Sequence, residues 1–271
     1  TVRPKSKVLI IAGSDSSGGA GIQADIKTVT AFGSYAMTAI TAVTAQNTKG
    51  VKKVISIPTK IVQKQITMNL DDIGTHSVKI GMLHNPDIIK SVYKTLKKYK
   101  LKNIVLDPVM IAKGGTKLIS NSSIKHLKKL LFPICTLVTP NIPEAEELTG
   151  YQISNKEDLI KVAKKILNMG PKSVLLKSGH LKNKMIFDVL ATKKGIKIFK
   201  KRKIKTKHTH GTGCTLSSAI ATCLSQKKNM VKSCKTSLRY VDKAIISAPG
   251  YGRGFGPLNH LISFNLKNIN V

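Results

Sequence analysis

Two kinds of apolar pattern alternate along the chain. Short, β-branched apolar runs predict buried strands, and apolar residues at helical spacing predict amphipathic helices. The expected strands are residues 7–13, 77–81, 103–107, 136–140 and 173–177, with a further antiparallel pair at 185–190 and 196–204. The expected helices are residues 22–32, 59–70, 86–99, 122–131, 142–148, 156–169, 213–224 and 230–248. Residues 35–44 fit either a strand or a helix.

This alternation predicts an α/β protein with a mainly parallel central sheet covered by helices on both faces. No internal repeat, low-complexity linker or shift in composition interrupts the pattern over the 271 residues. We therefore expect one domain spanning residues 1–271.

The charge is unusual, with 46 Lys and Arg against 13 Asp and Glu and a formal net charge of +33. Such a balance is typical of nucleic-acid-binding proteins. The lysines are, however, spread along the chain, and six Phe, six Tyr and no Trp leave few rings for base stacking. Abundant Lys, Ile and Asn favour codon bias as the cause, and nucleic-acid binding remains the alternative. The densest basic run, residues 193–207, is expected to be the solvated face of an edge hairpin.

Other features of the composition argue against some classes of protein. The four cysteines form no C-x-x-C pair, which favours free thiols in a reducing compartment. No apolar stretch reaches the roughly 18 residues of a membrane span, and residues 1–7 are too polar for a signal peptide. Secreted scaffolds and transporters are therefore disfavoured, and we expect a cytoplasmic protein.

A glycine-rich segment, residues 13–21 (GSDSSGGAG), follows the first predicted strand. Glycines let a backbone approach a ligand closely, and ligands of doubly wound sheets lie beyond the carboxyl ends of the strands. The segment is neither a Walker A loop nor a clean dinucleotide fingerprint. The alternative is an ordinary turn in which Asp15 caps the helix.

A second segment, residues 210–214 (HGTGC), leads into an apolar helix. Glycines and the helix N-terminus direct backbone amides at one point, which predicts an anion site able to stabilise a developing phosphoryl charge. A thiol in this position is expected to have a lowered pKa and to be able to act as a base. The alternative is that Cys214 is a small buried residue at a helix start.

Polar residues follow several predicted strands and would meet at one rim of the sheet. Asp107 and Glu144 can support Mg²⁺ through water beside phosphates, or they can be a strand-end cap and a first-turn acid. Gln46, Met82 and Lys177 are on other strand ends, where together they can read a small planar ligand and a nucleotide. The histidine spacing argues against a zinc site.

Six motifs occur in an order that resembles one known family. They are GSDSSGGAGIQAD (residues 13–25), AQNT (45–48), KIGML (79–83), LDPVM (106–110), TPNIPE (139–144) and THGTGCTL (209–216). From about Val8 to Pro257, the chain resembles the hydroxymethylpyrimidine/phosphomethylpyrimidine kinases of thiamine biosynthesis, in the ribokinase superfamily. The resemblance implies a three-layer α/β/α sandwich. It also implies two ATP- and Mg²⁺-dependent steps in one site, from pyrimidine alcohol to monophosphate and then to diphosphate.

The resemblance also implies roles for individual residues. Gln46 would read the amino edge of the pyrimidine, in a pocket lined by Gly13, Ala20, Asp25, Met82 and Val109. Gly211, Thr212, Gly213 and Cys214 would form the anion hole, with Cys214 where most of the superfamily has an Asp base. Asp107, Asn141 and Glu144 would support Mg²⁺ and phosphate, and Lys177 would lie on the nucleotide side.

Some positions depart from the family pattern, and rival functions remain. Ser16, Gly114, Thr116 and Ser178 replace the usual residues, while Lys113 is retained and can contact phosphate or solvent. Pyridoxal kinases resemble this family and act on a similar alcohol, although the contexts of Gln46 and Met82 favour the pyrimidine. A sugar kinase would have Asp in place of Cys214. The family suggests a homodimer.

Overall fold

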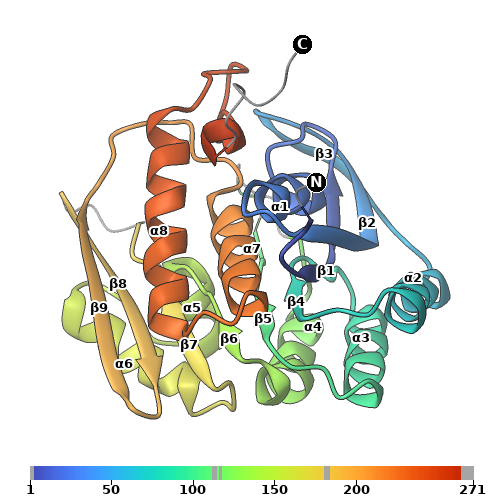
Figure 1. The fold of residues 1–271 in the computed structure, drawn as a ribbon. Coiled ribbons are helices and arrows are strands. Elements are labelled where there is room, and N and C mark those ends of the chain that lie inside the picture. Colours follow the sequence, from blue (N-terminus) through green and yellow to red (C-terminus); the bar gives the residue numbers. More distant parts are fainter. Residues whose placement is uncertain (1–2, 112–114, 116–117, 180–183, 264–271) are drawn as a thin grey trace.

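The computed structural model describes residues 3–111, 115, 118–179 and 184–263. Its centre is a nine-stranded sheet in the order β3-β2-β1-β4-β5-β6-β7-β8-β9 (Figure 1). The strands are β1 (Lys7–Asp15), β2 (Tyr35–Asn47), β3 (Gly50–Ser56), β4 (Ser77–Ile80), β5 (Ile104–Leu106), β6 (Leu137–Val138), β7 (Ser173–Leu176), β8 (Met185–Thr192) and β9 (Gly195–Arg202). Pairing is parallel from β2 through β7 and antiparallel at both edges.

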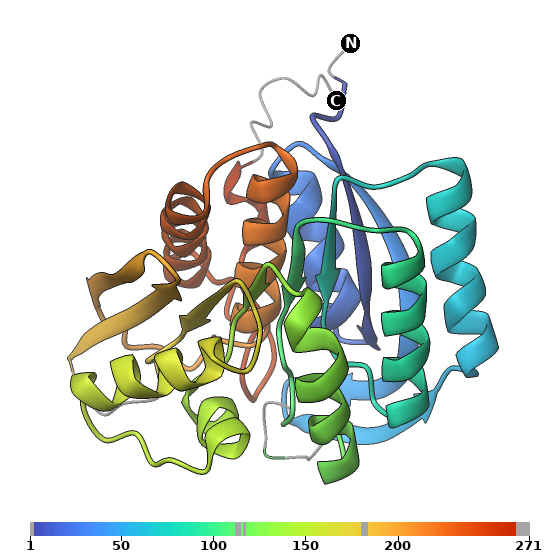
Figure 2. The same ribbon diagram turned by 90° about the horizontal axis from the view of Figure 1, so that it is seen from below.

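Helices cover both faces of the sheet (Figure 2). One face packs against α2 (Thr59–Asp72), α3 (Pro86–Lys98), α4 (Asn121–His126), α5 (Ile142–Thr149) and α6 (Lys156–Leu167). The other face packs against α1 (Gly21–Ala31), α7 (Thr212–Ser225) and α8 (Met230–Ile246). The expected three-layer α/β/α sandwich is confirmed.

Strand β1 shows why the buried runs are apolar throughout. Side chains alternate between the faces of a strand. Leu9 and Ile11 enter the core on one side, and Val8, Ile10 and Ala12 enter the core on the other. A strand covered on both faces therefore has no polar positions along its middle.

The structure decides one assignment that the sequence leaves open and corrects two others. Residues 35–44, left open between strand and helix, are part of strand β2, which extends to Asn47. Strand β3 was not expected, because its residues are mostly exposed or half-buried and show no apolar run. The helix expected at residues 122–131 is α-helical only to His126 and continues as a π-helical turn, Leu127–Leu131.

The hairpin of β8 and β9 is antiparallel, as expected, and its lysine-rich strand β9 lies at an edge of the sheet. The nine strands of the described residues belong to one sheet. Within the part of the chain that the structure describes, no helix is both long and apolar enough to cross a membrane.

Candidate active site

A cleft of about 640 Å³ runs along the carboxyl ends of the parallel strands. Every residue that the sequence analysis placed in the site lines this cleft, with the exception of Asp25. The lining residues from that set are Gly13, Ala20, Gln46, Met82, Asp107, Val109, Asn141, Glu144, Lys177, Gly211, Thr212, Gly213 and Cys214. The topology thus brings together motifs that are far apart in the sequence.

Asp15 organises the glycine-rich loop at one end of the cleft. Its carboxylate accepts hydrogen bonds from the backbone of Ser17 at 2.9 Å and of Ala20 at 2.8 Å. Nε2 of His210 lies 2.7 Å from the same carboxylate. Burial pushes the pKa of Asp15 upward, but the hydrogen bonds from His210 and Ser17 outweigh it and lower the pKa to about 2. Asp15 is therefore a charged anchor within the loop.

The two glycine-rich segments are in direct contact. Gly211 has a φ of +83°, and a Cβ there would lie 1.8 Å from the carbonyl oxygen of Gly19. A Cβ at Gly19 would in turn lie 2.4 Å from Cδ2 of His210. Only glycine permits this approach, which places the N-terminus of α7 beside the loop that follows β1.

The N-terminus of α7, where the sequence analysis expects an anion hole, lies in the cleft, and one of its amides is already paired. The N–H of Thr212 donates to the carbonyl of Thr209 at 3.3 Å, so it is already engaged. Gly213 and Cys214 belong to the first turn of α7, where backbone N–H groups have no acceptor within the helix. These two amides are therefore the donors that the helix presents to an anion.

The expectation of a lowered pKa for the Cys214 thiol is wrong. The residue keeps some exposure to the cleft. Burial nevertheless raises the pKa of its thiol to about 12, and the carboxylates of Asp25 and Asp107 act in the same direction. The ammonium of Lys79 opposes them without cancelling them. In the free protein the thiol is protonated at neutral pH.

Asp25 lies behind the wall of the cleft rather than in it. Its side chain is fully buried, and it pairs with the equally buried Lys79 at 2.6 Å. The hydroxyl of Ser218 donates to its second carboxylate oxygen at 2.7 Å. Burial raises the pKa of Asp25, while Lys79 counteracts that rise. The placement of Asp25 among the pocket-lining residues is therefore corrected. The Lys79–Asp25 ion pair is close enough to Cys214 for both charges to act on its thiol.

A second charged group lies at the middle of the cleft, where Lys177 and Asp107 pair at 2.9 Å. The hydroxyl of Thr139 donates to the same Asp107 oxygen at 3.0 Å. A Cβ on Gly213 would lie 3.1 Å from Asp107 and 3.2 Å from Lys177 Nζ. The ammonium, the carboxylate and the first turn of α7 therefore converge on one point.

Glu144 and Asn141 form the start of α5 next to this point. Asn141 Oδ1 accepts the N–H of Glu144 at 2.9 Å, and Glu144 Oε2 accepts the N–H of Asn141 at 2.8 Å. Glu144 is therefore an acid in the first turn of a helix, which was the structural alternative for it. It also lines the cleft. Burial raises the pKa of Glu144 to about 7, Lys177 lowers it, and Asp107 raises it.

The segment 251–257, here called the C-terminal strap, joins two segments that border the cleft. The N–H of Phe255 donates to the carbonyl of Thr48 at 2.8 Å, and the N–H of Gly254 donates to the Thr48 hydroxyl at 3.2 Å. The N–H of His210 donates to the carbonyl of Gly256 at 3.1 Å. The strap therefore holds both the turn after Gln46 and the start of the glycine-rich segment 210–214.

Sequence reasoning gave no role to Lys79 or to the His210–Asp15 pair. A lysine inside the apolar run SVKIG was a usable signal, because a buried ammonium requires a buried acid. The pairing of His210 with Asp15 has no local signal, since 195 positions separate the two residues. Lys113, Gly114 and Thr116 lie outside the described residues, as does His180, one of the histidines whose spacing argues against a zinc site.

Comparisons with known proteins identify the family. The family model described as phosphomethylpyrimidine kinase matches residues 15–259. The hydroxymethylpyrimidine/phosphomethylpyrimidine kinase of Bacillus subtilis is 41% identical over 266 residues, which are 98% of each chain. The thiamine biosynthesis bifunctional protein ThiED of Geobacter sulfurreducens is 45% identical over 260 residues, which cover 96% of this chain but 53% of that longer protein.

Solved structures agree with this result. A crystal structure of phosphomethylpyrimidine kinase from Clostridium difficile is 46% identical, with a TM-score of 0.79 over 89% of this chain and 99% of that one. An ADP complex of Bacillus subtilis pyridoxal kinase is 35% identical, with a TM-score of 0.87 over 94% of this chain and 97% of that one. The matched motifs, the fold and the cleft agree: the chain belongs to the phosphomethylpyrimidine kinase family.

Proposed function

We propose that this protein phosphorylates 4-amino-5-hydroxymethyl-2-methylpyrimidine with ATP, first to the monophosphate and then to the diphosphate, for thiamine diphosphate synthesis. The observation that carries the proposal is the convergence of Lys177, Asp107 and Gly213 in the same cleft as Gln46. One part of the cleft can pair with a heteroaromatic edge, and the other is built for phosphoryl groups. The family membership supports this choice.

The substrate end combines one amide with a mostly apolar wall. Gln46 lines the cleft, and its amide can pair with a ring nitrogen and an exocyclic amine at once. Met82 Cε would lie 2.5 Å from a Cβ on Gly13, so the glycine leaves room for the methionine side chain. Ala20, Met82 and Val109 then bound the space for a flat ring.

The phosphoryl end provides fixed positive potential. The amides of Gly213 and Cys214 and the ammonium of Lys177 are in place before the reaction, so they can stabilise charge on a phosphoryl group in transfer. Asp107 raises the pKa of Lys177 and Glu144 acts in the same direction, which outweighs the burial of that lysine. Lys177 therefore stays an ammonium. Its position beside the first turn of α7 supports the expectation that Lys177 contacts the nucleotide.

The acids on this rim fit Mg²⁺. The ion prefers hard oxygen ligands and often takes only one or two carboxylates, with phosphates and water completing its shell. Asp107 and Glu144 offer such oxygens on the cleft wall, and Asn141 positions Glu144. No cluster of three or more His, Cys, Asp or Glu suited to a metal occurs among the described residues. Phosphate and water would therefore complete the shell of an ion held by these two carboxylates. When bound, Mg²⁺ would neutralise phosphate charge.

Cys214 is the proposed acceptor for the proton of the hydroxymethyl group. Its thiol lies in the first turn of α7, and Lys79 is the nearby cation that favours the thiolate. The second acceptor is a phosphate whose own second pKa is about 6, so it needs alignment more than a base. One site can thereby serve both steps. A homodimer and a cytoplasmic location stay predictions.

The test is an ADP-release assay that compares the pyrimidine alcohol, its monophosphate and pyridoxal. We expect the pyrimidines to exceed pyridoxal in kcat/KM by at least about tenfold, or roughly 1.4 kcal/mol. Gln46→Leu should remove this preference, because the variant loses both hydrogen bonds of the amide. Gln226→Leu is the matched control, since Gln226 donates to the Phe32 carbonyl outside the cleft. Equal or better turnover of pyridoxal by the native protein would assign it to the pyridoxal kinases instead.

Binding to nucleic acid is the rival of a different class. The net charge of +33 is the observation in its favour. A filter-binding assay at about 150 mM salt decides it, because non-specific electrostatic binding weakens steeply with salt. Tight retention of DNA or RNA under these conditions would support that rival.

A further inference from the structure

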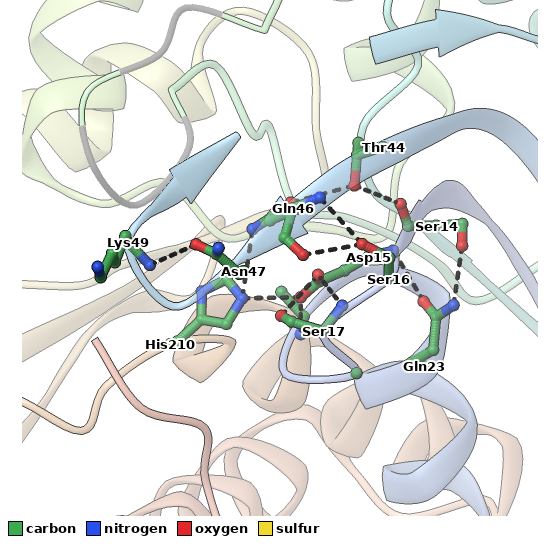
Figure 3. A network of polar contacts seen from close by, with 12 residues as sticks. Ser14, Asp15, Ser16, Ser17, Gln23, Thr44, Gln46, Asn47, Lys49 and His210 are labelled. Atoms are coloured by element: carbon green, nitrogen blue, oxygen red, sulfur yellow. Dashed lines mark hydrogen bonds and ion pairs between the residues drawn. The ribbon is translucent and has the colours of Figure 1, made fainter. Parts of the chain in front are cut away.

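The amide of Gln46 has two polar ends of nearly equal shape, and its neighbours decide how it is oriented. The side chain lies between Thr44 and His210 (Figure 3). In the structure, Oε1 lies 3.2 Å from Thr44 Oγ1, and Nε2 lies 3.4 Å from His210 Nε2. A half-turn of the amide exchanges these two atoms and moves nothing else. The surrounding hydrogen bonds must therefore show which orientation is the stable one.

His210 has no lone pair to offer the amide at Nε2. Its Nε2 lies 2.7 Å from the carboxylate of Asp15, and a carboxylate can only accept. Asp15 is ionised, since hydrogen bonds hold its pKa near 2 against the effect of burial. Nε2 therefore carries a hydrogen whether the imidazole is neutral or charged. That hydrogen is directed at Asp15, so an amide nitrogen on this side finds no acceptor and faces another N–H group, whereas an amide oxygen faces the positive N–H edge of the ring.

Thr44 presents a lone pair to the amide. Its hydroxyl lies 2.9 Å from the carbonyl oxygen of Ser14, which can only accept. The single hydroxyl hydrogen is used there, so the amide group facing Thr44 must be the donor. Both neighbours thus favour the same orientation, with nitrogen toward Thr44 and oxygen toward His210.

The backbone of Gln46 is fixed as well. The hydroxyl of Ser16 donates to the Gln46 carbonyl at 2.8 Å and accepts the Gln46 N–H at 2.9 Å. Thr44 and His210 are each about 5% exposed, so water does not readily replace either contact. The exchange of the two amide ends is therefore what these two neighbours control.

We propose that Thr44 and the His210–Asp15 pair are positioning residues that hold the Gln46 amide with nitrogen toward Thr44 and oxygen toward His210. The amide then offers the ligand one N–H and one lone pair in a fixed order. This inference rests on the proposed function, because it names what that site selects. A 4-aminopyrimidine edge has an acceptor nitrogen beside an amino donor and matches this order. The 4-oxo analogue has a donor N–H beside an acceptor oxygen, so both contacts are mispaired.

The experiment compares 4-amino-5-hydroxymethyl-2-methylpyrimidine with its 4-oxo analogue as acceptors, and the ratio of their kcat/KM values is the readout. For the native protein we expect a ratio of about 10³ or more, because a site built for hydrogen bonds strongly rejects a mispaired ligand. Thr44→Val and His210→Phe should each lower this ratio by at least about tenfold, since the amide is then free to reverse. The loss should appear mainly as better use of the 4-oxo compound.

Matched variants separate orientation from stability. His210→Gln keeps N–H donors for Asp15 and Gln46 and should retain most of the ratio. Thr28→Val removes another buried hydroxyl that donates to a backbone carbonyl, at 2.7 Å from Ala24, and should leave the ratio unchanged. If His210→Phe does not fold, Thr44→Val decides the matter.

The outcomes distinguish this inference from the proposed function. A ratio within about twofold of native in Thr44→Val, or an equal change in Thr28→Val, overturns the positioning role while the pyrimidine kinase assignment stands. A native protein that phosphorylates neither pyrimidine overturns both.

Discussion

The role of Cys214 can be tested through the pH dependence of alcohol phosphorylation. Burial raises the pKa of the thiol to about 12, so at pH 7 roughly one molecule in 10⁵ holds the thiolate. If this thiolate is the base, kcat for the alcohol rises about tenfold per pH unit between pH 6 and 9 and shows no plateau. A general base contributes about 10²–10⁴-fold. Cys214→Ala should therefore lower this step by such a factor and flatten its pH profile.

Phosphorylation of the monophosphate should respond less. That acceptor is already largely ionised above pH 7, and Cys214→Ala leaves the backbone amides of α7 in place. Single-turnover measurements with saturating ATP and Mg²⁺ separate the two steps. Cys223→Ala is the matched control, because it removes a fully buried thiol from the same helix.

Three results would refute the reasoning about Cys214. Equal losses in both steps would mean that the residue acts through charge or positioning. A tenfold rise per pH unit that survives in Cys214→Ala would place the base elsewhere. No loss in a variant that is folded by circular dichroism would make Cys214 a small packing residue at a helix start.

Further predictions concern the metal, the loop and the strap. Glu144→Gln should need a higher Mg²⁺ concentration for half-maximal activity than the control variant Glu157→Gln. For the native protein, that concentration should rise as the pH falls through the Glu144 pKa of about 7, because the protonated carboxyl binds Mg²⁺ less well. Mg²⁺ titrations at pH 6 and pH 8 measure both effects. The pKa of Asp15 is about 2 in the native state, below the ordinary value of 3.8. At pH values above about 4 this difference stabilises the native state by about 2 kcal/mol. The stabilisation is lost as the pH falls from about 4 to 2. The gap in urea stability between native protein and Asp15→Asn should shrink over that range; a constant gap would refute the pairing. Gly254→Ala places a Cβ 2.1 Å from the Thr48 carbonyl and should cost about 1–3 kcal/mol by thermal unfolding, whereas Gly250→Asn, with nothing within 4 Å, should be nearly neutral.

The layers of the fold were predictable because parallel strands buried on both faces leave an unmistakable pattern. The exceptions are elements stabilised by neighbours rather than by their own pattern. Strand β3 exists because β2 offers it hydrogen bonds from Ala42 to Asn47. The π-helical turn after α4 likewise has no counterpart in apolar spacing.

The site was predictable to the extent that residues at strand ends converge. Asp107, Asn141 and Lys177 come together because the carboxyl ends of parallel strands share one rim. The predictions that failed concerned properties set by burial and by contacts between distant residues. The sequence places Asp25 four residues into α1 without showing that the face it occupies is buried against Lys79. The thiol of Cys214 lies at a helix N-terminus as expected, but its pKa follows from burial and two carboxylates, and these appear only in three dimensions.

The C-terminal strap has a consequence for how the protein is made. Synthesis proceeds from the N-terminus, so Asp15 and Gln46 leave the ribosome long before His210 and residues 251–257. The contacts that complete the substrate end therefore form only when nearly the whole chain has emerged. A ligand that binds the finished cleft stabilises completed molecules and gives nascent chains no such stabilisation. The vitamin precursor would then act as a selective stabiliser, favouring finished enzyme over truncated products during quality control.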